Sequence, residues 1–181
     1  MIPTLSADKI ILAPFSMADA PLVRHYMGDP EISRVTRHVP FPYPDGAAEK
    51  WIASHLLNFL EQRNVVFSIR SQEGELHGAI NLRLDLTEKL GNLGYWMAVP
   101  FWNRGYCTDA VRRLIRYGFE NFPLNKIHAR HLAVNPASGR VMQKSGMTQE
   151  GFLRQHVIKD GVAMDLVEYG ILRDELPASS V

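Results

Sequence analysis

The sequence predicts an α+β fold of the α/β/α type, in which an open, mixed, mainly antiparallel twisted sheet of about seven strands has helices on both faces. Apolar residues recur with a period of two between residues 65 and 99, which is typical of neighbouring antiparallel strands. The segments before and after that region carry apolar residues at helical spacing. A strand, a helix and another strand follow one another between residues 93 and 134, and this order favours one parallel pair inside the sheet.

In the first half of the chain, the sequence predicts one strand, followed by helices and a loop. An apolar run predicts a strand at residues 9–15, and Ser16 can cap the helix that follows it. The Asp29-Pro30 pair starts a short helix. Three prolines with no regular period predict a loop at residues 37–46, and Asp45 is expected to cap a longer helix.

The second half alternates strands with helices. A turn of the sequence QEGE at residues 72–75 separates the first two strands of this half, and Gly146 ends the last helix. The expected strands are residues 65–71, 76–86, 93–99, 126–134, 150–159 and 164–173. The expected helices are residues 108–121 and 138–145, and residues 177–181 are expected to be a frayed tail.

Size and composition favour one domain over residues 1–181 and exclude several classes of function. The net charge is +1, which argues against a nucleic-acid partner and against an anionic membrane. The single cysteine, Cys107, permits no intramolecular disulfide, and no apolar stretch approaches the ~18 residues of a membrane span. The N-terminal residues lack the pattern of a signal peptide, so a cytoplasmic protein is expected.

The segment GYWMAVPFWNRGYCTDA at residues 94–110 carries the clearest chemical signal. An apolar strand ends near Pro100, and Asn103-Arg104-Gly105 then leads directly into a helix. A glycine loop that opens a helix leaves backbone N–H groups pointing outward at the positive end of the helix dipole, which suits a phosphate. Neither a GxxxxGK[ST] motif nor a GxGxxG motif after a strand is present, which excludes a P-loop and leaves a dinucleotide fold unsupported.

The same segment closely resembles the coenzyme A loop of the GNAT N-acetyltransferase superfamily, and within it the branch of ribosomal-protein N-terminal acetyltransferases. A second segment, from Val134 to Met147, resembles the N-x-x-S-x-x-V-x-x-K-x-G-F stretch of that branch. The resemblance spans roughly residues 9–173. It implies a single N-acetyltransferase domain, the GNAT fold with splayed central parallel strands, and acetyl-coenzyme A as acyl donor without a metal.

Carried over residue by residue, the resemblance implies two groups of site residues. Ser138 is the first choice and Tyr95 the second choice for a catalytic group that helps the thiolate leave. Ser138 would also lie near the sulfur of the cofactor, and it could be a helix N-cap as well as, or instead of, a catalytic group. The residues implied to bind the cofactor, mostly through backbone amides, are Met97, Val99, Arg104, Gly105, Tyr106, Cys107, Thr108, Asn135 and Ser138.

The expected acceptor is a primary amine, and the branch points to the N-terminal α-amine of a protein or peptide. An α-amine has a pKa of ~7.7–8, whereas a lysine at ~10.4 is almost fully charged near neutral pH, a deficit of ~4 kcal/mol. Glu88, Glu150 and His156 are weak candidates for a general base, and Val157, where the branch sometimes has glutamate, cannot act as one. This shortage of bases favours an α-amine.

Several alternatives stay open from the sequence. The chain could acetylate a small amine such as a polyamine, an amino acid or an antibiotic, or it could be a non-catalytic acyl-coenzyme A-binding module. Either a monomer or a homodimer is compatible with the sequence. His128 and His131 lie three apart on a predicted strand and therefore point to opposite faces, which disfavours a shared metal. Cys107 is expected to be a small buried residue rather than a nucleophile.

Overall fold

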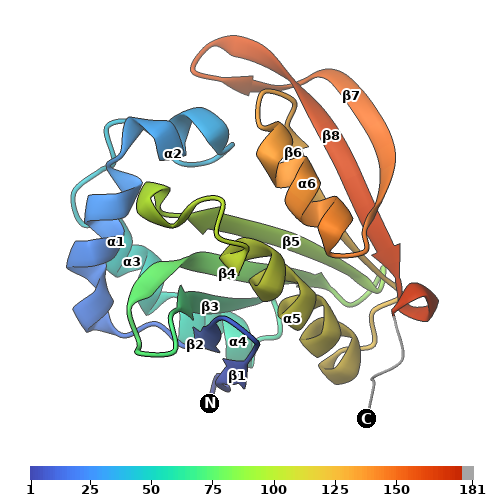
Figure 1. The fold of residues 1–181 in the computed structure, drawn as a ribbon, viewed down its shortest axis with the longest axis horizontal. Coiled ribbons are helices and arrows are strands. Elements are labelled where there is room, and N and C mark those ends of the chain that lie inside the picture. The colour runs from blue at the N-terminus through green and yellow to red at the C-terminus, as the bar shows by residue number, and fades with distance from the viewer. Residues whose placement is uncertain (177–181) are drawn as a thin grey trace.

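A computed structural model describes residues 1–176 of the chain. Its centre is a sheet of eight strands in the order β1-β2-β3-β4-β5-β6-β8-β7 (Figure 1). All neighbouring strands are antiparallel except β5 and β6, which run parallel. The strands are β1 (Leu5–Ser6), β2 (Ile11–Ala13), β3 (Asn64–Arg70), β4 (Leu76–Asp85), β5 (Leu90–Met97), β6 (Lys126–Leu132), β7 (Thr148–Lys159) and β8 (Val162–Leu172).

The predicted mixed, mainly antiparallel sheet is thus confirmed, with one strand more than expected. The additional strand, β1, has only two residues, which is too short to leave a periodic signal in the sequence. The predicted tail at residues 177–181 lies outside the described residues.

Helices cover both faces of the sheet (Figure 1). The ring of Tyr117 on α5 meets Phe67 of β3 at 5.7 Å between centroids, and α6 lies on the same face as α5. The helices α3 and α4 cover the other face. The helices are α1 (Ala20–Met27), α2 (Pro30–Val35), α3 (Ala47–Ala53), α4 (His55–Leu60), α5 (Tyr106–Asn121) and α6 (Pro136–Lys144). None of the helices within residues 1–176 has both the length and the apolar character to cross a membrane.

The parallel pair separates partway along its length. Pairing between β5 and β6 runs from Leu90 opposite Lys126 to Leu93 opposite Ala129. Both strands continue beyond this point, β5 to Met97 while paired with β4 and β6 to Leu132 while paired with β8. The expected splay is therefore present, and the ends of β5 and β6 leave a gap in the sheet.

Several element boundaries differ from the predictions for local physical reasons. Strand β5 ends at Met97, and Val99 begins a short 3-10 helix (Val99–Phe101), since Pro100 fixes a helical φ and donates no ladder hydrogen bond. Gly46, with φ of 72°, precedes α3 in place of Asp45. The long helix predicted there is interrupted at Ser54, which separates α3 from α4.

The buried histidine at the start of α4, His55, is expected to make the free energy of unfolding depend on pH. His55 packs its ring against Trp51 at 4.5 Å and Phe15 at 5.5 Å, and neither ring nitrogen has a hydrogen-bond partner. Burial lowers the pKa of His55 to about 4. The imidazole is therefore neutral in the folded protein under conditions where the unfolded chain binds a proton.

We expect wild type to lose about 1–2 kcal/mol more free energy of unfolding than a His55→Phe variant between pH 7 and pH 5. The folded-state pKa is depressed, so stability from the neutral ring is complete above pH 6.5 and is lost as the pH falls toward 4. Phenylalanine keeps the aromatic packing and removes the titration. Urea unfolding of both proteins at the two pH values measures the difference, and equal losses would contradict the assignment.

Candidate functional site

The loop before α5 is shaped to receive an anion. Asn103 and Gly105 both have positive φ, 61° and 83°, on either side of Arg104. The first hydrogen bond of the helix runs from the Asp109 N–H to the Gly105 carbonyl at 3.1 Å. Within residues 1–176, the backbone N–H groups of residues 104–108 donate to no protein acceptor. A turn of alternating φ sign directs such groups toward one point, which the helix dipole makes still more favourable for negative charge.

Three contacts fix this loop against the sheet. Trp102 donates its indole N–H to the Met97 carbonyl at 2.6 Å, which fastens the loop to the end of β5. The imidazole of His77, on β4, stacks between the rings of Phe101 at 3.9 Å and Tyr106 at 4.8 Å. The loop is therefore preorganised by side chains, and His77 is a support that no sequence pattern indicated.

The gap between β5 and β6 opens after Leu93, and β5 leads from there toward the loop. The Ala98 N–H bonds to the His77 carbonyl on β4 at 2.9 Å, and because backbone groups alternate along a strand, the Met97 N–H points toward the gap. The Val99 N–H opens a 3-10 helix and has no acceptor within it. The Val99 carbonyl accepts from the Trp102 N–H at 3.2 Å. The Met97 N–H thus faces the space that a strand would otherwise fill, and the Val99 N–H, two residues further on, is a second main-chain donor next to it.

The two candidate catalytic side chains meet across this gap. The Tyr95 hydroxyl, from β5, lies 2.7 Å from Ser138 Oγ, from α6, and 3.1 Å from the Ser138 carbonyl oxygen. Burial strongly raises the pKa of Tyr95, and the neighbouring Cys107 and Tyr169 add to the effect. The phenol therefore keeps its proton throughout the working pH range and can act as a donor.

Two residues near the Tyr95–Ser138 pair, Cys107 and Asn135, have surroundings that a structural role explains. Burial raises the pKa of Cys107 to about 12, so the thiol stays protonated at neutral pH. Asn135 caps α6 by accepting the Ser138 N–H at 3.3 Å, and its amide donates to the Val35 carbonyl at 3.1 Å, which ties α6 to the end of α2. Ser138 is the third residue of α6, so it is not the N-cap.

Two candidate bases lie at the wrong end of the sheet. Glu150 pairs with Lys126 at 2.5 Å, at the start of β6, and Glu88 lies in the turn before β5. At ~3.3 Å per residue, the start of β6 is about 20 Å from its splayed end. Both predictions are therefore wrong. Of the other two positions, His156 is exposed on β7 and Val157 is buried against Leu132 and Leu166.

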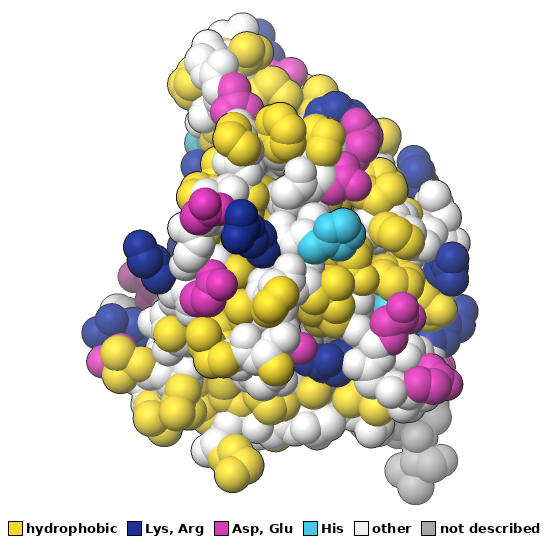
Figure 2. Space-filling model, turned by 90° about the vertical axis from the view of Figure 1, so that its left-hand side faces the viewer, with side chains coloured by type: hydrophobic (Ala, Val, Ile, Leu, Met, Phe, Trp, Pro, Cys, Tyr) yellow, Lys and Arg dark blue, Asp and Glu magenta, His cyan; other side chains and the backbone are white. Residues whose placement is uncertain are grey.

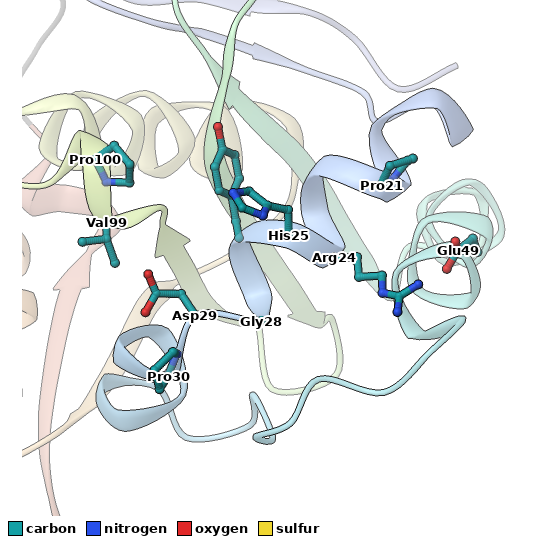
Figure 3. Close-up of a pocket in the computed structure, with 10 residues that line it drawn as sticks. Pro21, Arg24, His25, Gly28, Asp29, Pro30, Glu49, Val99 and Pro100 are labelled. Atoms are coloured by element: carbon teal, nitrogen blue, oxygen red, sulfur yellow. The ribbon is translucent and has the colours of Figure 1, made fainter.

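A pocket of about 830 Å³ adjoins the splayed end of β5 (Figure 3). Val99 and Pro100 form one side, and Arg24 and Glu49 lie on the other, with Asp29 between them. Arg24 is paired with Asp45 at 2.5 Å. Figure 2 shows cationic and anionic side chains interspersed among apolar ones on this side of the molecule, without a patch of one sign. The pocket lining is Pro21, Arg24, His25, Tyr26, Gly28, Asp29, Pro30, Glu49, Val99 and Pro100.

The residues that could bind a metal are dispersed. His131 Nδ1 lies 2.8 Å from the Leu132 carbonyl oxygen, and His128 Nδ1 lies 3.4 Å from a carboxylate oxygen of Glu168. The two histidines alternate in direction along β6, as predicted. Across residues 1–176, no three histidine, cysteine, aspartate or glutamate side chains group closely enough to hold a metal ion.

Comparisons with known proteins agree with this geometry. The family profile described as "Acetyltransferase (GNAT) domain" matches residues 9–148. The chain is 25% identical over 173 residues to "Uncharacterized N-acetyltransferase p20" of Bacillus licheniformis, covering 95% of this chain and 97% of that relative. It is 28% identical over 85 residues to the "Ribosomal-protein-serine acetyltransferase" of Escherichia coli, covering 46% and 48% of the two chains.

A solved structure extends the likeness to nearly the whole chain. The structure described as "Mycobacterium smegmatis RimJ in complex with CoA-disulfide" superimposes with a TM-score of 0.87. It shares 21% sequence identity, and the match covers 98% of this chain and 91% of that one. At this sequence identity, the structural similarity is evidence for a shared fold alone.

Proposed function

The chain belongs to the GNAT acetyltransferase family, and from that premise we propose that residues 1–181 form a single N-acetyltransferase domain that moves the acetyl group of acetyl-coenzyme A onto a primary amine. The acceptor we propose is the N-terminal α-amine of a protein or peptide. The observation that supports this most is the coincidence, at one place, of unpartnered main-chain N–H groups and a parted strand pair. The first suits a diphosphate and the second suits an extended thioester arm.

The residues along the groove, by which we mean the gap between β5 and β6 together with the loop before α5, fit coenzyme A. The N–H groups of residues 104–108 would hold the diphosphate, with Arg104 adding charge. The N–H groups of Met97 and Val99 would meet the arm and the acetyl carbonyl. Asn135, whose side-chain oxygen and amide are already engaged, would contribute through the position it gives α6. A thioester supplies an activated acyl group with a thiolate as leaving group.

The chemistry that remains for the protein is charge stabilisation and one proton transfer. A backbone N–H aimed at the developing oxyanion contributes about 3 kcal/mol to transition-state stabilisation in other acyl transfers. At the other end of the breaking bond, the Tyr95–Ser138 pair holds a proton that a departing thiolate needs. Direct attack by the amine in a ternary complex requires no covalent intermediate on the chain.

The choice of an α-amine rests on protonation. Glu88 and Glu150 lie far from the groove, and the amine is proposed to arrive neutral or to lose its proton to water. Near pH 7.5 roughly a third of an α-amine is neutral, against about one lysine side chain in a thousand. The likeness to a ribosomal-protein-serine acetyltransferase supports the same choice.

We expect an N-terminal peptide amine to be acetylated about 10²-fold faster than a lysine at pH 7.5. The test uses one peptide sequence in two forms, one with a free N-terminus and acetylated lysine and one with the reverse, and follows free thiol release. The rate on lysine should rise about tenfold per pH unit up to pH ~10, whereas the rate on the α-amine should level off near pH 8. Ser138→Ala serves as the low-activity control.

Other results would redirect the assignment. Equal rates on both peptides near neutral pH would remove the α-amine proposal, because a base in the protein would then have to deprotonate lysine. Tight binding of acetyl-coenzyme A without thiol release on any amine would instead show a binding module.

A further inference from the structure

A lysine from the start of the chain reaches the loop before α5. The Cβ that any other residue would carry at position 105 lies 3.4 Å from the Lys9 ammonium nitrogen and meets no other atom within 4 Å. Lys9 itself is exposed. More than ninety positions separate the two residues in the chain, so only the fold brings the ammonium over Gly105.

The backbone of Lys9 is anchored at this place by the helix it faces. The Lys9 N–H donates to the carboxylate of Asp109 at 2.8 Å, and Asp109 lies in the first turn of α5. Asp109 is thereby engaged with the main chain of Lys9. Across residues 1–176 the Lys9 ammonium forms no ion pair and no hydrogen bond.

The position is electrostatically unfavourable for a cation in the absence of a ligand. The N-terminus of a helix carries a partial positive charge, and the Lys9 ammonium lies at this end of α5, next to its N-cap Gly105. Cations normally stabilise the opposite end of a helix. A bound anion makes the electrostatic interaction at this place favourable, because the anion attracts both the ammonium and the N–H groups.

We propose that Lys9 is a binding residue for the diphosphate of coenzyme A, an assignment that rests on the function proposed above. The ammonium lies 3.4 Å from the Cβ position of Gly105, within the loop whose N–H groups would hold the anion, so its expected partner is the diphosphate rather than a phosphate elsewhere on the cofactor. Asp109 is the positioning residue, since it holds the backbone of Lys9 against α5.

Calorimetric titration of coenzyme A into four proteins tests this assignment: wild type, Lys9→Met, Lys9→Arg and Lys50→Met. Methionine keeps the apolar stem and removes the charge, arginine keeps the charge, and Lys50 is a matched exposed lysine on α3. We expect Lys9→Met to bind about tenfold more weakly and Lys9→Arg to recover most of the loss. Lys50→Met should bind like wild type.

Two further measurements separate a diphosphate contact from a contact with the 3′-phosphate and from a general loss of stability. The loss in Lys9→Met should be the same with 3′-dephospho-coenzyme A, which retains the diphosphate. The midpoint of thermal unfolding without ligand should be unchanged or slightly higher in Lys9→Met, because a repulsive charge has been removed.

Three outcomes would overturn a stated claim. Unchanged affinity in Lys9→Met, with wild type still binding, would reject the role of Lys9 and leave the proposed function intact. A loss seen with coenzyme A but absent with the 3′-dephospho form would reject the diphosphate as the contact. If wild type bound neither ligand, the proposed function itself would fail.

Discussion

Replacing Gly105 with valine is expected to weaken acetyl-coenzyme A binding by at least about 100-fold, because the loop loses the conformation that directs several N–H groups at one anion. Gly105 has φ of 83°, and a left-handed backbone costs a residue with a side chain roughly 1–2 kcal/mol, more for a β-branched one. The variant is expected to relieve that strain by rotating the peptide units on either side of position 105, which turns the N–H groups of residue 105 and Tyr106 away from the anion. Calorimetry with acetyl-coenzyme A measures the effect.

A second glycine provides a matched control for backbone strain. Gly46 has φ of 72° and also stands directly before a helix, and a Cβ there meets no atom within 4 Å. Gly46→Val should therefore lower stability by a similar amount and leave cofactor affinity near that of wild type. If both variants lost affinity equally, global destabilisation would account for the result and the loop would have no special role. Retained affinity in Gly105→Val would contradict the diphosphate site directly.

The layout of the fold could be predicted because the sequence expresses it locally. The change of apolar period near residue 65 indicated the antiparallel strands, and the strand–helix–strand order indicated the parallel pair of β5 and β6. The two residues of β1 could not be predicted, because two residues are too few to show an alternation of apolar and polar side chains. Likewise, the break at Ser54 leaves helical spacing on both sides, so the sequence reads as one helix.

In the candidate site, too, the features encoded locally in the sequence could be predicted, and those that only the fold brings together could not. The loop at Gly105 was recognisable because a positive-φ glycine and a helix start are adjacent in sequence. Tyr95 and Ser138 were chosen separately, and the fold places their hydroxyls 2.7 Å apart. Lys9 reaches the loop from the turn between β1 and β2, His77 reaches it from β4, and neither residue carries a sequence signal of its own. Glu88 and Glu150 failed as bases because sequence gives the type of a side chain but not the end of the sheet where it lies.

The Tyr95–Ser138 contact leads to the other large expected effect. Tyr95→Phe and Ser138→Ala should each lower kcat by about 10- to 100-fold, at the modest end of general acid catalysis, since a thiolate is already a good leaving group. The kcat of the double variant should be only slightly below that of the less active single variant, because the effects of substitutions are not additive when the two residues act as one unit. Steady-state kinetics of the four proteins gives the coupling, and Tyr117→Phe, which alters a buried tyrosine on α5, is the control.

Leaving-group chemistry distinguishes proton donation from mere positioning. An acyl donor whose thiol has a lower pKa needs less help to depart, so it should restore much of the activity of Tyr95→Phe while gaining little in wild type. Because burial raises the pKa of Tyr95, the phenol stays protonated, and kcat of wild type should show no alkaline loss from this group below pH ~10. If the activated donor rescued neither variant, the hydroxyl pair would be positioning the substrate. If the two losses multiplied instead, Tyr95 and Ser138 would act on separate steps, and the 2.7 Å contact would not be a shared path for the proton.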